Sequence, residues 1–432
     1  MTAQVFDLSP ARALRGRLAV PGDKSISHRY TLFGAIANGM TEITHLAPGA
    51  DVASTAACLR GLGVEIDVPA ANALRIHGRG LRALRAPDAP LDAGNSGTTI
   101  RLLAGVLATC PFQTTVIGDA SLSRRPMRRV IDPLVAMGAR ITSEDGRAPL
   151  VIEGGRLEGL RWKSPVASAQ VKSAILLAGL AAHGVTSVVE PLPTRDHTER
   201  AFPAFGLRVD VTPGANTVSV TGGQTATAPA GPLRVPGDPS SAAVWAAAAA
   251  ALPGSSVELT GVCLNPLRLG FLRALERMGA DITIVNEGES AGEPVGTIRV
   301  AHGAHVATSI APDEVPSLID ELPVLAARAA LGGGLEVSGA GELRVKESDR
   351  ITALVDGFRR LGVVAEERPD GFVIEGRRQP TGGTADAASD HRLVMAFTLV
   401  ALGSAGPTTV TDAGAVAISY PDFARDLAGL IS

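Results

Sequence analysis

The sequence predicts an α/β protein of two domains, each built from three repeated units. At 432 residues the chain exceeds the size at which one hydrophobic core stops growing, so two domains of about 200 residues each are expected. Segments with helical periodicity alternate with segments of strand-like alternation, and both recur along the chain. This alternation is typical of layered α/β folds.

The longer repeat is the signature Val-Pro-Gly-Asp, which occurs at residues 20–23 and again at 235–238. Each copy is followed by an Ala-rich helical stretch and then by a strand-like run, Thr41–Thr44 in the first half and Ser256–Leu259 in the second. We interpret the chain as duplicated, with the signatures at the two crossings between domains.

This interpretation sets the domain boundaries. The N-terminal domain spans residues 21–234, and the C-terminal domain combines residues 1–20 with residues 235–432. The segment Met1–Val20 is therefore expected to return to the C-terminal half, with Phe6 and Leu8 packed there.

The shorter repeat is an apolar helix end, a glycine and an alternating strand. The glycine suits the left-handed residue that ends a helix, and the alternation suits a half-buried strand. A truncated sixth copy occurs at Ala428–Leu430, which gives six units of about 70 residues. The five full copies are Leu62–Ile66, Met137–Ile141, Phe205–Val209, Met278–Ile282 and Leu361–Ala365.

Composition excludes several classes of partner. Aromatic residues make up 3% of the chain and the net charge is −3, so no nucleic acid and no anionic membrane surface is expected to bind. The Ala-rich run 242–252 is too short to span a bilayer, and residues 1–20 lack a secretory apolar core. The three cysteines, Cys58, Cys110 and Cys263, are odd in number and widely spaced, which predicts reduced thiols in the cytoplasm.

Unusual polar clusters lie in the loops that precede the repeated helices. Such loops expose unpaired backbone N–H groups and the positive end of the helix dipole, which favours bound phosphate or carboxylate, and added Lys or Arg strengthens the site. The clusters are residues 22–29, 94–101, 124–127, 168–172, 194–199, 344–350 and 390–392.

Lysine usage singles out two of these loops. Only four lysines occur in a chain rich in arginine, and Lys24 and Lys346 lie beside Gly, Ser and Glu in the polar loops. A point charge on a flexible stem can bridge two anions, so we expect both to be functional. Lys163 and Lys172 are interpreted as structural or surface residues.

Other motifs allow two interpretations when they are taken singly. Residues 94–99 could form a plain turn before a helix, and Arg125-Pro126 could simply begin one. Asp320-Glu321 could cap a helix or carry protons. The three histidines beside arginines match no helical zinc motif and suit either structural hydrogen bonding or a place in the site; they are His28, His197 and His391.

Taken together, these motifs resemble the 5-enolpyruvylshikimate-3-phosphate (EPSP) synthase family along essentially the whole chain. The resemblance is carried by Gly-Asp-Lys-Ser-Ile-Ser-His-Arg, Arg-Pro-Met, Ser-Ala-Gln-Val-Lys, Arg-Asp-His-Thr-Glu and Arg-Val-Lys-Glu-Ser-Asp-Arg, in the family's order. It implies the two-domain enolpyruvyl transferase fold, an inside-out α/β barrel in which each domain has three βαβαββ units.

The resemblance also implies a reaction. The enolpyruvyl group of phosphoenolpyruvate passes to the 5-hydroxyl of shikimate 3-phosphate by addition and elimination, and phosphate is released. Crowded anions require several fixed cations, and the proton transfers require carboxylates. The resemblance implies that the reaction needs no metal and no organic cofactor and that the enzyme is a monomer. It also implies that the enzyme acts in the pathway to chorismate and the aromatic amino acids and is the target of glyphosate.

The resemblance also implies a role for each residue at a matching motif position, and the roles that follow are the ones it implies. Asp320 lies near the attacked hydroxyl and Glu347 near the methylene carbon of phosphoenolpyruvate, and either could act at either proton-transfer step; Lys24 lies between both substrates. The N-terminal domain is the shikimate 3-phosphate side and the C-terminal domain the phosphoenolpyruvate side. Shikimate 3-phosphate is bound by Lys24, Ser25, Arg29, Ser168, Ala169, Gln170, Arg195, Asp320 and Lys346; phosphoenolpyruvate is bound by Lys24, Gly97, Arg125, Gln170, Arg350 and Arg392.

Several positions depart from the family's pattern. The segment 417–421 has no lysine before its aromatic-Pro pair, so one phosphoenolpyruvate cation is either missing at Ile418 or supplied elsewhere in the chain. Two motifs resemble the glyphosate-tolerant subclass, yet Leu267 replaces its usual threonine, and Gly97 is the small residue associated with sensitivity. These features leave tolerance or sensitivity open.

Two alternative functions are weighed against this one. An enolpyruvyl transferase acting on UDP-N-acetylglucosamine would have Lys-Asn at the first crossing and a loop cysteine, whereas this chain has Lys24-Ser25 and no cysteine between residues 114 and 129. A non-catalytic repeat protein that binds polyanions would spread its basic residues over one face instead of concentrating them in loops.

Overall fold

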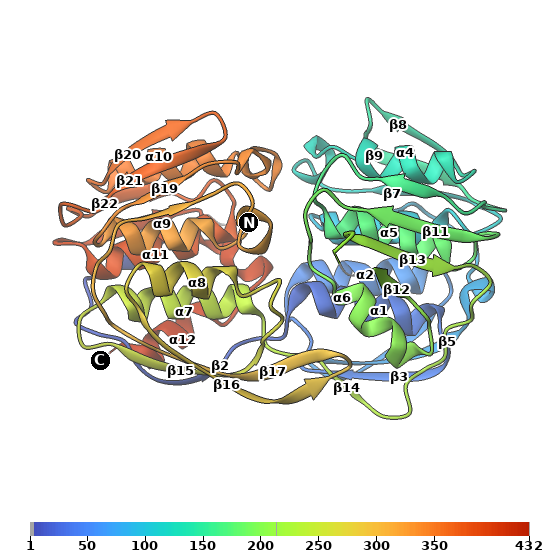
Figure 1. The fold of residues 1–432 in the computed structure, drawn as a ribbon, viewed down its shortest axis with the longest axis horizontal. Helices are drawn as coiled ribbons and strands as arrows, with labels where there is room; N and C mark the ends of the chain where they lie inside the picture. The colour runs from blue at the N-terminus through green and yellow to red at the C-terminus, as the bar shows by residue number, and fades with distance from the viewer. Residues whose placement is uncertain (1–3, 213, 432) are drawn as a thin grey trace. The chain divides into compact units, whose positions relative to one another are not determined.

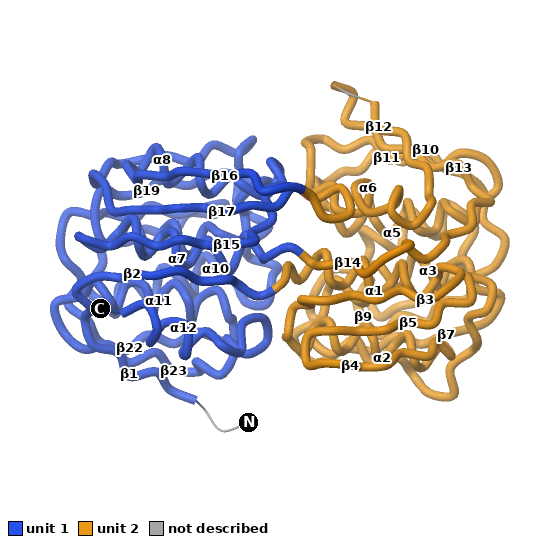
Figure 2. The backbone as a smooth tube through the Cα atoms, turned by 90° about the horizontal axis from the view of Figure 1, so that it is seen from below, with its two compact units in different colours: residues 1–21, 236–288, 294–432 blue, residues 22–235, 289–293 orange. Residues whose placement is uncertain are grey.

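The computed structural model describes residues 4–212 and 214–431, and it is an α/β structure, which confirms the predicted fold class. The chain forms two compact units (Figure 2). Unit 1 comprises Met1–Pro21, Pro236–Gly288 and Pro294–Ser432, and unit 2 comprises Gly22–Val235 with Glu289–Glu293. The chain passes between units at the two Val-Pro-Gly-Asp signatures. The tip of a hairpin, Glu289–Glu293, belongs to unit 2, which the sequence analysis did not anticipate.

Unit 2 contains three four-stranded sheets and six α-helices (Figure 1) within its described residues. The sheet orders are β14-β3-β5-β4, β6-β7-β9-β8 and β10-β11-β13-β12. The strands are β3 (Asn38–Thr44), β4 (Glu65–Ala70), β5 (Ala73–Arg79), β6 (Leu91–Asp92), β7 (Gln113–Ile117), β8 (Arg140–Glu144), β9 (Arg147–Glu153), β10 (Arg161–Lys163), β11 (Val185–Val189), β12 (Asp210–Thr212), β13 (Thr217–Thr221) and β14 (Leu233–Arg234). The helices are α1 (Lys24–Ile36), α2 (Ala50–Gly61), α3 (Gly97–Leu107), α4 (Arg128–Ala136), α5 (Ala169–Gly179) and α6 (His197–Ala201).

Unit 1 has sheets in the orders β16-β17-β15-β2, β18-β19-β21-β20 and β1-β23-β22. Its strands are β1 (Phe6–Leu8), β2 (Arg15–Ala19), β15 (Ser256–Cys263), β16 (Asp281–Ser290), β17 (Glu293–Ala301), β18 (Thr308–Ile310), β19 (Leu335–Val337), β20 (Val364–Arg368), β21 (Gly371–Glu375), β22 (Gly383–Asp386) and β23 (Thr408–Thr411). Its helices are α7 (Pro239–Ala251), α8 (Gly270–Arg277), α9 (Leu322–Ala330), α10 (Arg350–Arg360), α11 (His391–Gly403) and α12 (Phe423–Leu430).

The six sheets of the described residues share one topology. In each, an edge strand pairs parallel with a second strand, and the second pairs antiparallel with a third. The N-terminal segment supplies strands to two sheets of unit 1, because β2 pairs with β15 and β1 pairs with β23. Phe6 stacks on Phe423 in that unit, and Leu8 packs against its core. Met1–Ala3 lie outside the described residues.

The central helices of each unit are buried on all sides. Every residue of α3, α7 and α9 is buried, as are α1 from Ile26, α5 from Val171 and α11 up to Leu402. Helices that are buried all round require cover on every face, and both the sheets and the neighbouring central helices provide it (Figure 1). The first residues of α1 and α5 are only half-buried, so these helices reach the surface at their N-termini.

The five full copies of the short repeat are confirmed. Gly63, Gly138, Gly206, Gly279 and Gly362 all have positive φ, between 70° and 116°, and each precedes a strand. The sixth copy is wrong: Gly429 lies inside α12 instead of ending it.

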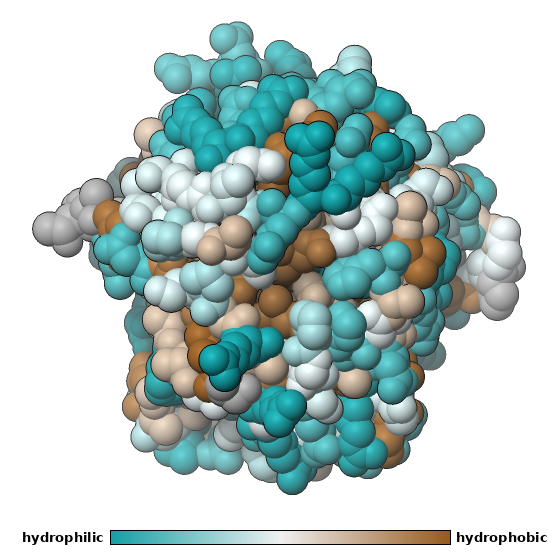
Figure 3. Space-filling model, turned by 90° about the vertical axis from the view of Figure 1, so that its left-hand side faces the viewer, coloured by the Kyte–Doolittle hydropathy of each residue, from teal (hydrophilic) through white to brown (hydrophobic). Residues whose placement is uncertain are grey.

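The surface, the helix lengths and the cysteines relate to the expectations of no membrane span and of reduced thiols. On the face drawn in Figure 3, hydrophilic side chains are interspersed with small apolar areas. Among the described residues, no helix is both long enough and apolar enough to cross a membrane. All three cysteines are buried and unbridged, and burial raises the pKa of Cys58 to about 12 and of Cys110 to about 11.

Candidate active site

Three helix N-termini of unit 2 carry the predicted binding residues. α1 begins at Lys24, α3 at Gly97 and α5 at Ala169, each just after its capping side chain. One cap satisfies only part of the first turn, so further backbone N–H groups stay available to an anion. The capping bonds run from the N–H groups of Ile26, Thr99 and Val171 to Asp23, Ser96 and Ser168.

Lys24 is held by a carboxylate from the next helix. Its Nζ lies 3.0 Å from Oδ2 of Asp51, in the first turn of α2. The Lys24 side chain keeps 20% of its surface exposed, whereas that of Asp51 keeps 11%. The ammonium is therefore aimed by a partner and still accessible, and Ser25 beside it is half-buried.

Arg29 is deeply buried, with 2% of its surface exposed. Its Nε donates to Oγ1 of Thr198 at 2.9 Å, and Nη2 donates to Oγ of Ser173 at 2.8 Å. Nη1, the part-buried nitrogen, donates to the carbonyl of Ser25 at 2.9 Å. Burial lowers the pKa of Arg29 to about 10, the carboxylate of Glu199 opposes that shift, and the charge of Arg195 adds to it. Only the Nη1 edge of this guanidinium faces the Lys24 loop.

Gly97 lies against two arginines. A Cβ on Gly97 would lie 2.6 Å from Nη1 of Arg101 and 3.2 Å from Nη1 of Arg125. Arg101 in turn donates from Nη1 to Oε1 of Gln170 at 2.6 Å, and Gln170 donates from Nε2 to Oγ1 of Thr98 at 2.9 Å. The α3 and α5 N-termini are thus joined through Gln170, and the absence of a side chain at Gly97 leaves room for both guanidinium groups.

Arg125 and Arg195 complete the predicted residues of unit 2. Arg125 follows the 3₁₀ turn Leu122–Arg124, keeps 7% of its surface exposed, and donates from Nη2 to Oδ1 of Asn95 at 2.6 Å. Arg195 is half-buried, two residues before α6 begins, and its charge reaches Arg29.

In unit 1, three cations converge on Asp320, which lies just before α9. Nζ of Lys346 and Nη1 of Arg350 each lie 3.4 Å from its Oδ1. Nη1 of Arg392 donates to its backbone carbonyl at 3.0 Å. Arg392 also lies 3.6 Å from the buried carboxylate of Glu321. The side chain of Asp320 keeps 14% of its surface exposed, so a substrate group can reach it.

Arg350 binds the second predicted proton carrier as well. Its Nη2 lies 2.6 Å from Oε2 of Glu347, and its Nε lies 2.7 Å from Oδ2 of Asp390, the cap of α11. Burial alone would lower the pKa of Arg350, but the carboxylates of Asp390, Glu347 and Asp320 outweigh burial and raise it. One permanently charged guanidinium therefore fixes both Asp320 and Glu347.

Residues 8–427 match the sequence model of the family described as EPSP synthase (3-phosphoshikimate 1-carboxyvinyltransferase). The chain belongs to this family. It is therefore an enzyme of the transferase class, as the sequence predicts, and its pathway is the shikimate route to aromatic amino acids.

Individual EPSP synthases are similar over nearly their full length. The chain is 50% identical over 415 residues to 3-phosphoshikimate 1-carboxyvinyltransferase of Acidithiobacillus ferrooxidans, covering 96% of this chain and 95% of the relative. It is 49% identical over 426 residues to that of Chloroflexus aurantiacus, covering 98% of each. A solved EPSP synthase structure from Acinetobacter baumannii has a TM-score of 0.87 at 42% identity, covering 100% of this chain and 99% of that one. The enolpyruvyl transferase fold is thereby confirmed, and neither alternative function is favoured.

Sequence reasoning gave no role to four residues that hold the EPSP synthase motifs in place. Asn95, Arg101 and Asp390 lie inside the polar motifs, so their motif membership was the available signal. Asp51 lies in no motif, and its pairing with Lys24 joins helices 27 residues apart. The structure was needed to find it.

The remaining predicted features have structural roles. His28 hydrogen-bonds Oγ1 of Thr55 through Nδ1 at 2.7 Å, and burial lowers its pKa to about 3, although Asp51 opposes this. Lys172 is buried between Glu190 at 2.8 Å and Glu199 at 2.7 Å, as a structural residue would be, whereas Lys163 is exposed on β10. The hydrogen bond of His28 with Thr55 and the ion pairs of Lys172 with Glu190 and Glu199 all lie within unit 2.

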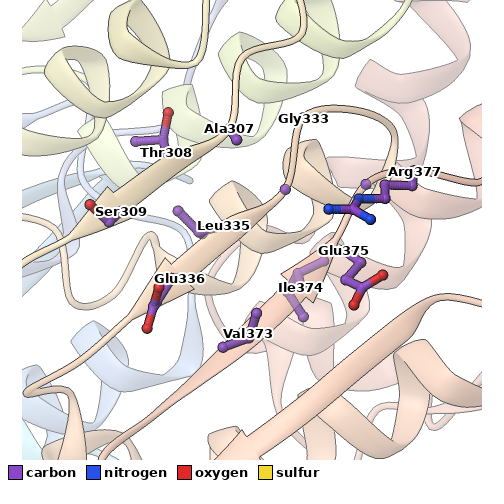
Figure 4. Close-up of a pocket in the computed structure, with 12 residues that line it drawn as sticks. Ala307, Thr308, Ser309, Gly333, Leu335, Glu336, Val373, Ile374, Glu375 and Arg377 are labelled. Carbon is purple, nitrogen blue, oxygen red and sulfur yellow. The ribbon is translucent and has the colours of Figure 1, made fainter.

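Two further places in unit 1 are the segment that ends at Ile418 and a pocket beside β18, β19 and β21. Ile418 ends the 3₁₀ segment Ala413–Ile418, which contains no cation. The pocket is lined by residues of β18, β19 and β21, by the residues just before β18 and β19, and by the residues just after β21 (Figure 4). None of the predicted site residues lines this pocket. Within the described residues, no group of three His, Cys, Asp or Glu side chains could hold a metal ion.

Proposed function

We propose that this EPSP synthase transfers the enolpyruvyl group of phosphoenolpyruvate to the 5-hydroxyl of shikimate 3-phosphate. A proton adds to the methylene carbon, and the hydroxyl oxygen bonds to the neighbouring carbon while losing its own proton. The resulting tetrahedral intermediate then loses a methyl proton and phosphate, which leaves the enolpyruvyl ether. No proton is gained or lost overall beyond that carried by the phosphate released.

The observation that carries this proposal is the set of contacts around Arg350. Its Nη1 lies 3.4 Å from Asp320 and its Nη2 lies 2.6 Å from Glu347, so one rigid fork spaces the two acids. Addition and elimination require two proton carriers that act on neighbouring atoms. The Arg350 side chain is 2% exposed and cannot swing freely, so the spacing is set before substrate binds.

We assign the substrates to residues on the same basis. In unit 2, Lys24, Ser25, Arg29, Ser168, Ala169, Gln170 and Arg195 bind shikimate 3-phosphate, together with Asp320 and Lys346 of unit 1. Phosphoenolpyruvate is bound by Gly97, Arg125 and Gln170 of unit 2 and by Arg350 and Arg392 of unit 1, with Lys24 serving both. The N-termini of α1, α3 and α5, whose backbone N–H groups can bind an anion, and the buried arginines support this assignment.

Product analysis tests the proposal. Incubation with phosphoenolpyruvate and shikimate 3-phosphate should give new vinyl proton signals and inorganic phosphate in NMR spectra. UDP-N-acetylglucosamine in place of shikimate 3-phosphate serves as the control and should give neither. Vinyl transfer to the nucleotide sugar would contradict the proposed acceptor.

We further propose that the chain acts as a monomer in the cytoplasm, as expected from its sequence. The three unbridged, buried cysteines support a reducing compartment. Sedimentation equilibrium of the purified chain should return a mass near 44.1 kDa, and a mass twice that value would contradict the monomer.

A further inference from the structure

The hairpin formed by β16 and β17 begins and ends in unit 1, but its tip, Glu289–Glu293, belongs to unit 2 (Figure 2). The two residues between the strands, Ala291 and Gly292, have φ values of 46° and 80°. Positive φ at both positions is the requirement of a tight two-residue turn that matches the twist of the strands. The proposed reaction gives this tip no role.

The tip makes buried polar contacts with α6. Oε1 of Glu293 lies 2.6 Å from Nδ1 of His197, and both side chains are 1% exposed. A carboxylate can only accept, so Nδ1 carries the proton in this bond. Arg200 donates from Nη1 to the carbonyl of Gly292 at 2.8 Å, and its Nε lies 3.9 Å from Oε2 of Glu293.

The backbone of the tip approaches α6 closely enough to exclude a side chain. A Cβ on Gly292 would lie 2.6 Å from the carbonyl oxygen of Arg200, which is a backbone atom and cannot swing aside. Glycine is therefore required by both the turn and the contact. The positive φ of the turn and the close approach to Arg200 are independent requirements, and together they fix the position of the tip against α6.

The opposite side of the same segment is fixed by α5. Nζ of Lys172 lies 2.7 Å from Glu199 and donates to the carbonyl of Thr194 at 3.4 Å. Thr194 and Glu199 bracket Arg195, so the Lys172 ammonium holds the chain on both sides of that residue. Arg29 adds a bond to Thr198 at 2.9 Å.

α6 needs these contacts because it has only five residues. A helix this short is not stable on its own propensity, so tertiary contacts must order it. The orientation of Arg195, at its N-terminal end, then depends on two clamps: the Lys172 cluster and the hairpin tip. The first lies within α5 and the loops of unit 2, and the second is supplied by a segment about 95 residues further along the chain.

We propose that Glu293 is a positioning residue for shikimate 3-phosphate, acting through His197 and α6 on Arg195. The inference rests on the proposed role of Arg195 in binding that substrate. Loss of the Glu293 carboxylate removes the contact on one side of α6, so Arg195 is less ordered in the free enzyme. Binding of shikimate 3-phosphate must then order Arg195, and this loss of conformational entropy weakens binding. Phosphoenolpyruvate binding does not depend on Arg195 and is unaffected.

Steady-state kinetics of three variants test this inference. Glu293→Ala should raise KM for shikimate 3-phosphate by roughly tenfold while KM for phosphoenolpyruvate stays within about twofold of wild type. Glu293→Gln keeps an acceptor for Nδ1 of His197 and should show a smaller rise. Gly292→Ala should resemble Glu293→Ala, because it displaces the tip. Glu287→Gln is the matched control, since this exposed carboxylate of the same hairpin accepts a bond from Thr297 and should leave both constants unchanged.

The outcomes separate the inference from the proposed function. Arg195→Ala should raise KM for shikimate 3-phosphate; if it does and the Glu293 and Gly292 variants do not, the positioning role is overturned and the function stands. If Arg195→Ala leaves that constant unchanged, the assigned role of Arg195 and the positioning role both fail. Equal rises in both KM values would indicate a general structural defect and would also overturn the inference. Should Glu293→Ala fail to fold, Glu293→Gln and Gly292→Ala decide the result.

Discussion

Replacing Gly97 with alanine places one methyl group where the structure has two guanidinium groups. The new Cβ would lie 2.6 Å from Nη1 of Arg101 and 3.2 Å from Nη1 of Arg125. The first distance is too short for any stable contact, so the end of the Arg101 side chain must move. That nitrogen also donates to Oε1 of Gln170 at 2.6 Å, and the movement breaks or lengthens this bond.

The size of the effect follows from the bond that is lost. A hydrogen bond to a charged group contributes about 1.5–3 kcal/mol. Since about 1.4 kcal/mol corresponds to a tenfold change in an equilibrium constant, KM for phosphoenolpyruvate should rise about ten- to hundredfold. The shift of Arg125, at 3.2 Å, adds to this in the same direction.

Phosphoenolpyruvate saturation curves at fixed shikimate 3-phosphate measure the change. Gly429→Ala is the matched control, because its Cβ would meet nothing within 4 Å and it lies inside α12, where alanine should stabilise slightly. In an Arg101→Ala background the Gly97→Ala effect should shrink, since the clash is gone. An unchanged KM for phosphoenolpyruvate with altered glyphosate inhibition would refute this reasoning and place the methyl against the inhibitor alone.

Three further predictions concern the same enzyme. Arg125→Ala or Arg392→Ala should raise KM for phosphoenolpyruvate, and saturation kinetics equal to wild type would remove the residue from the clamp. Glu347→Gln should slow turnover by roughly a hundredfold with substrate binding largely kept, measured by steady-state rates and calorimetric titration. His28 should destabilise the fold as pH falls, because burial lowers its pKa from 6.5 to about 3 and the unfolded chain takes up the proton first. Below pH 6.5 the free energy of unfolding should fall by up to about 1.4 kcal/mol per pH unit, and His28→Gln should remove that slope from pH-dependent thermal melts.

Much of the fold could be predicted from local sequence. Each of Gly63, Gly138, Gly206, Gly279 and Gly362 ends a helix with positive φ, because a left-handed residue and the alternation after it are properties of a few neighbouring residues. Gly429 shows where this reasoning fails: the same apolar-Gly pattern lies inside α12, and the glycine does not end that helix.

The site could be predicted in part. Charged residues in loops before helices singled out Lys24, Arg125, Lys346 and Arg350, and the structure gives each of them a polar or charged partner. Their roles in binding substrate stay predictions. Their partners could not be found, because the bond from Lys24 to Asp51 depends on how two helices pack.

The contacts of the hairpin tip, Glu289–Glu293, could not be predicted from the sequence. Residues 289–293 belong to none of the motifs found in the sequence, yet they lie in unit 2, where Glu293 makes a buried contact with His197, 96 residues away. Pairings of that kind have no local signal.

The central claim is that the enzyme moves the enolpyruvyl group to shikimate 3-phosphate rather than simply hydrolysing phosphoenolpyruvate. Phosphate release from phosphoenolpyruvate, measured with and without shikimate 3-phosphate, tests it most directly. We expect release only when the acceptor is present, in equal amount to the enolpyruvyl product. Release that is independent of the acceptor would contradict the claim.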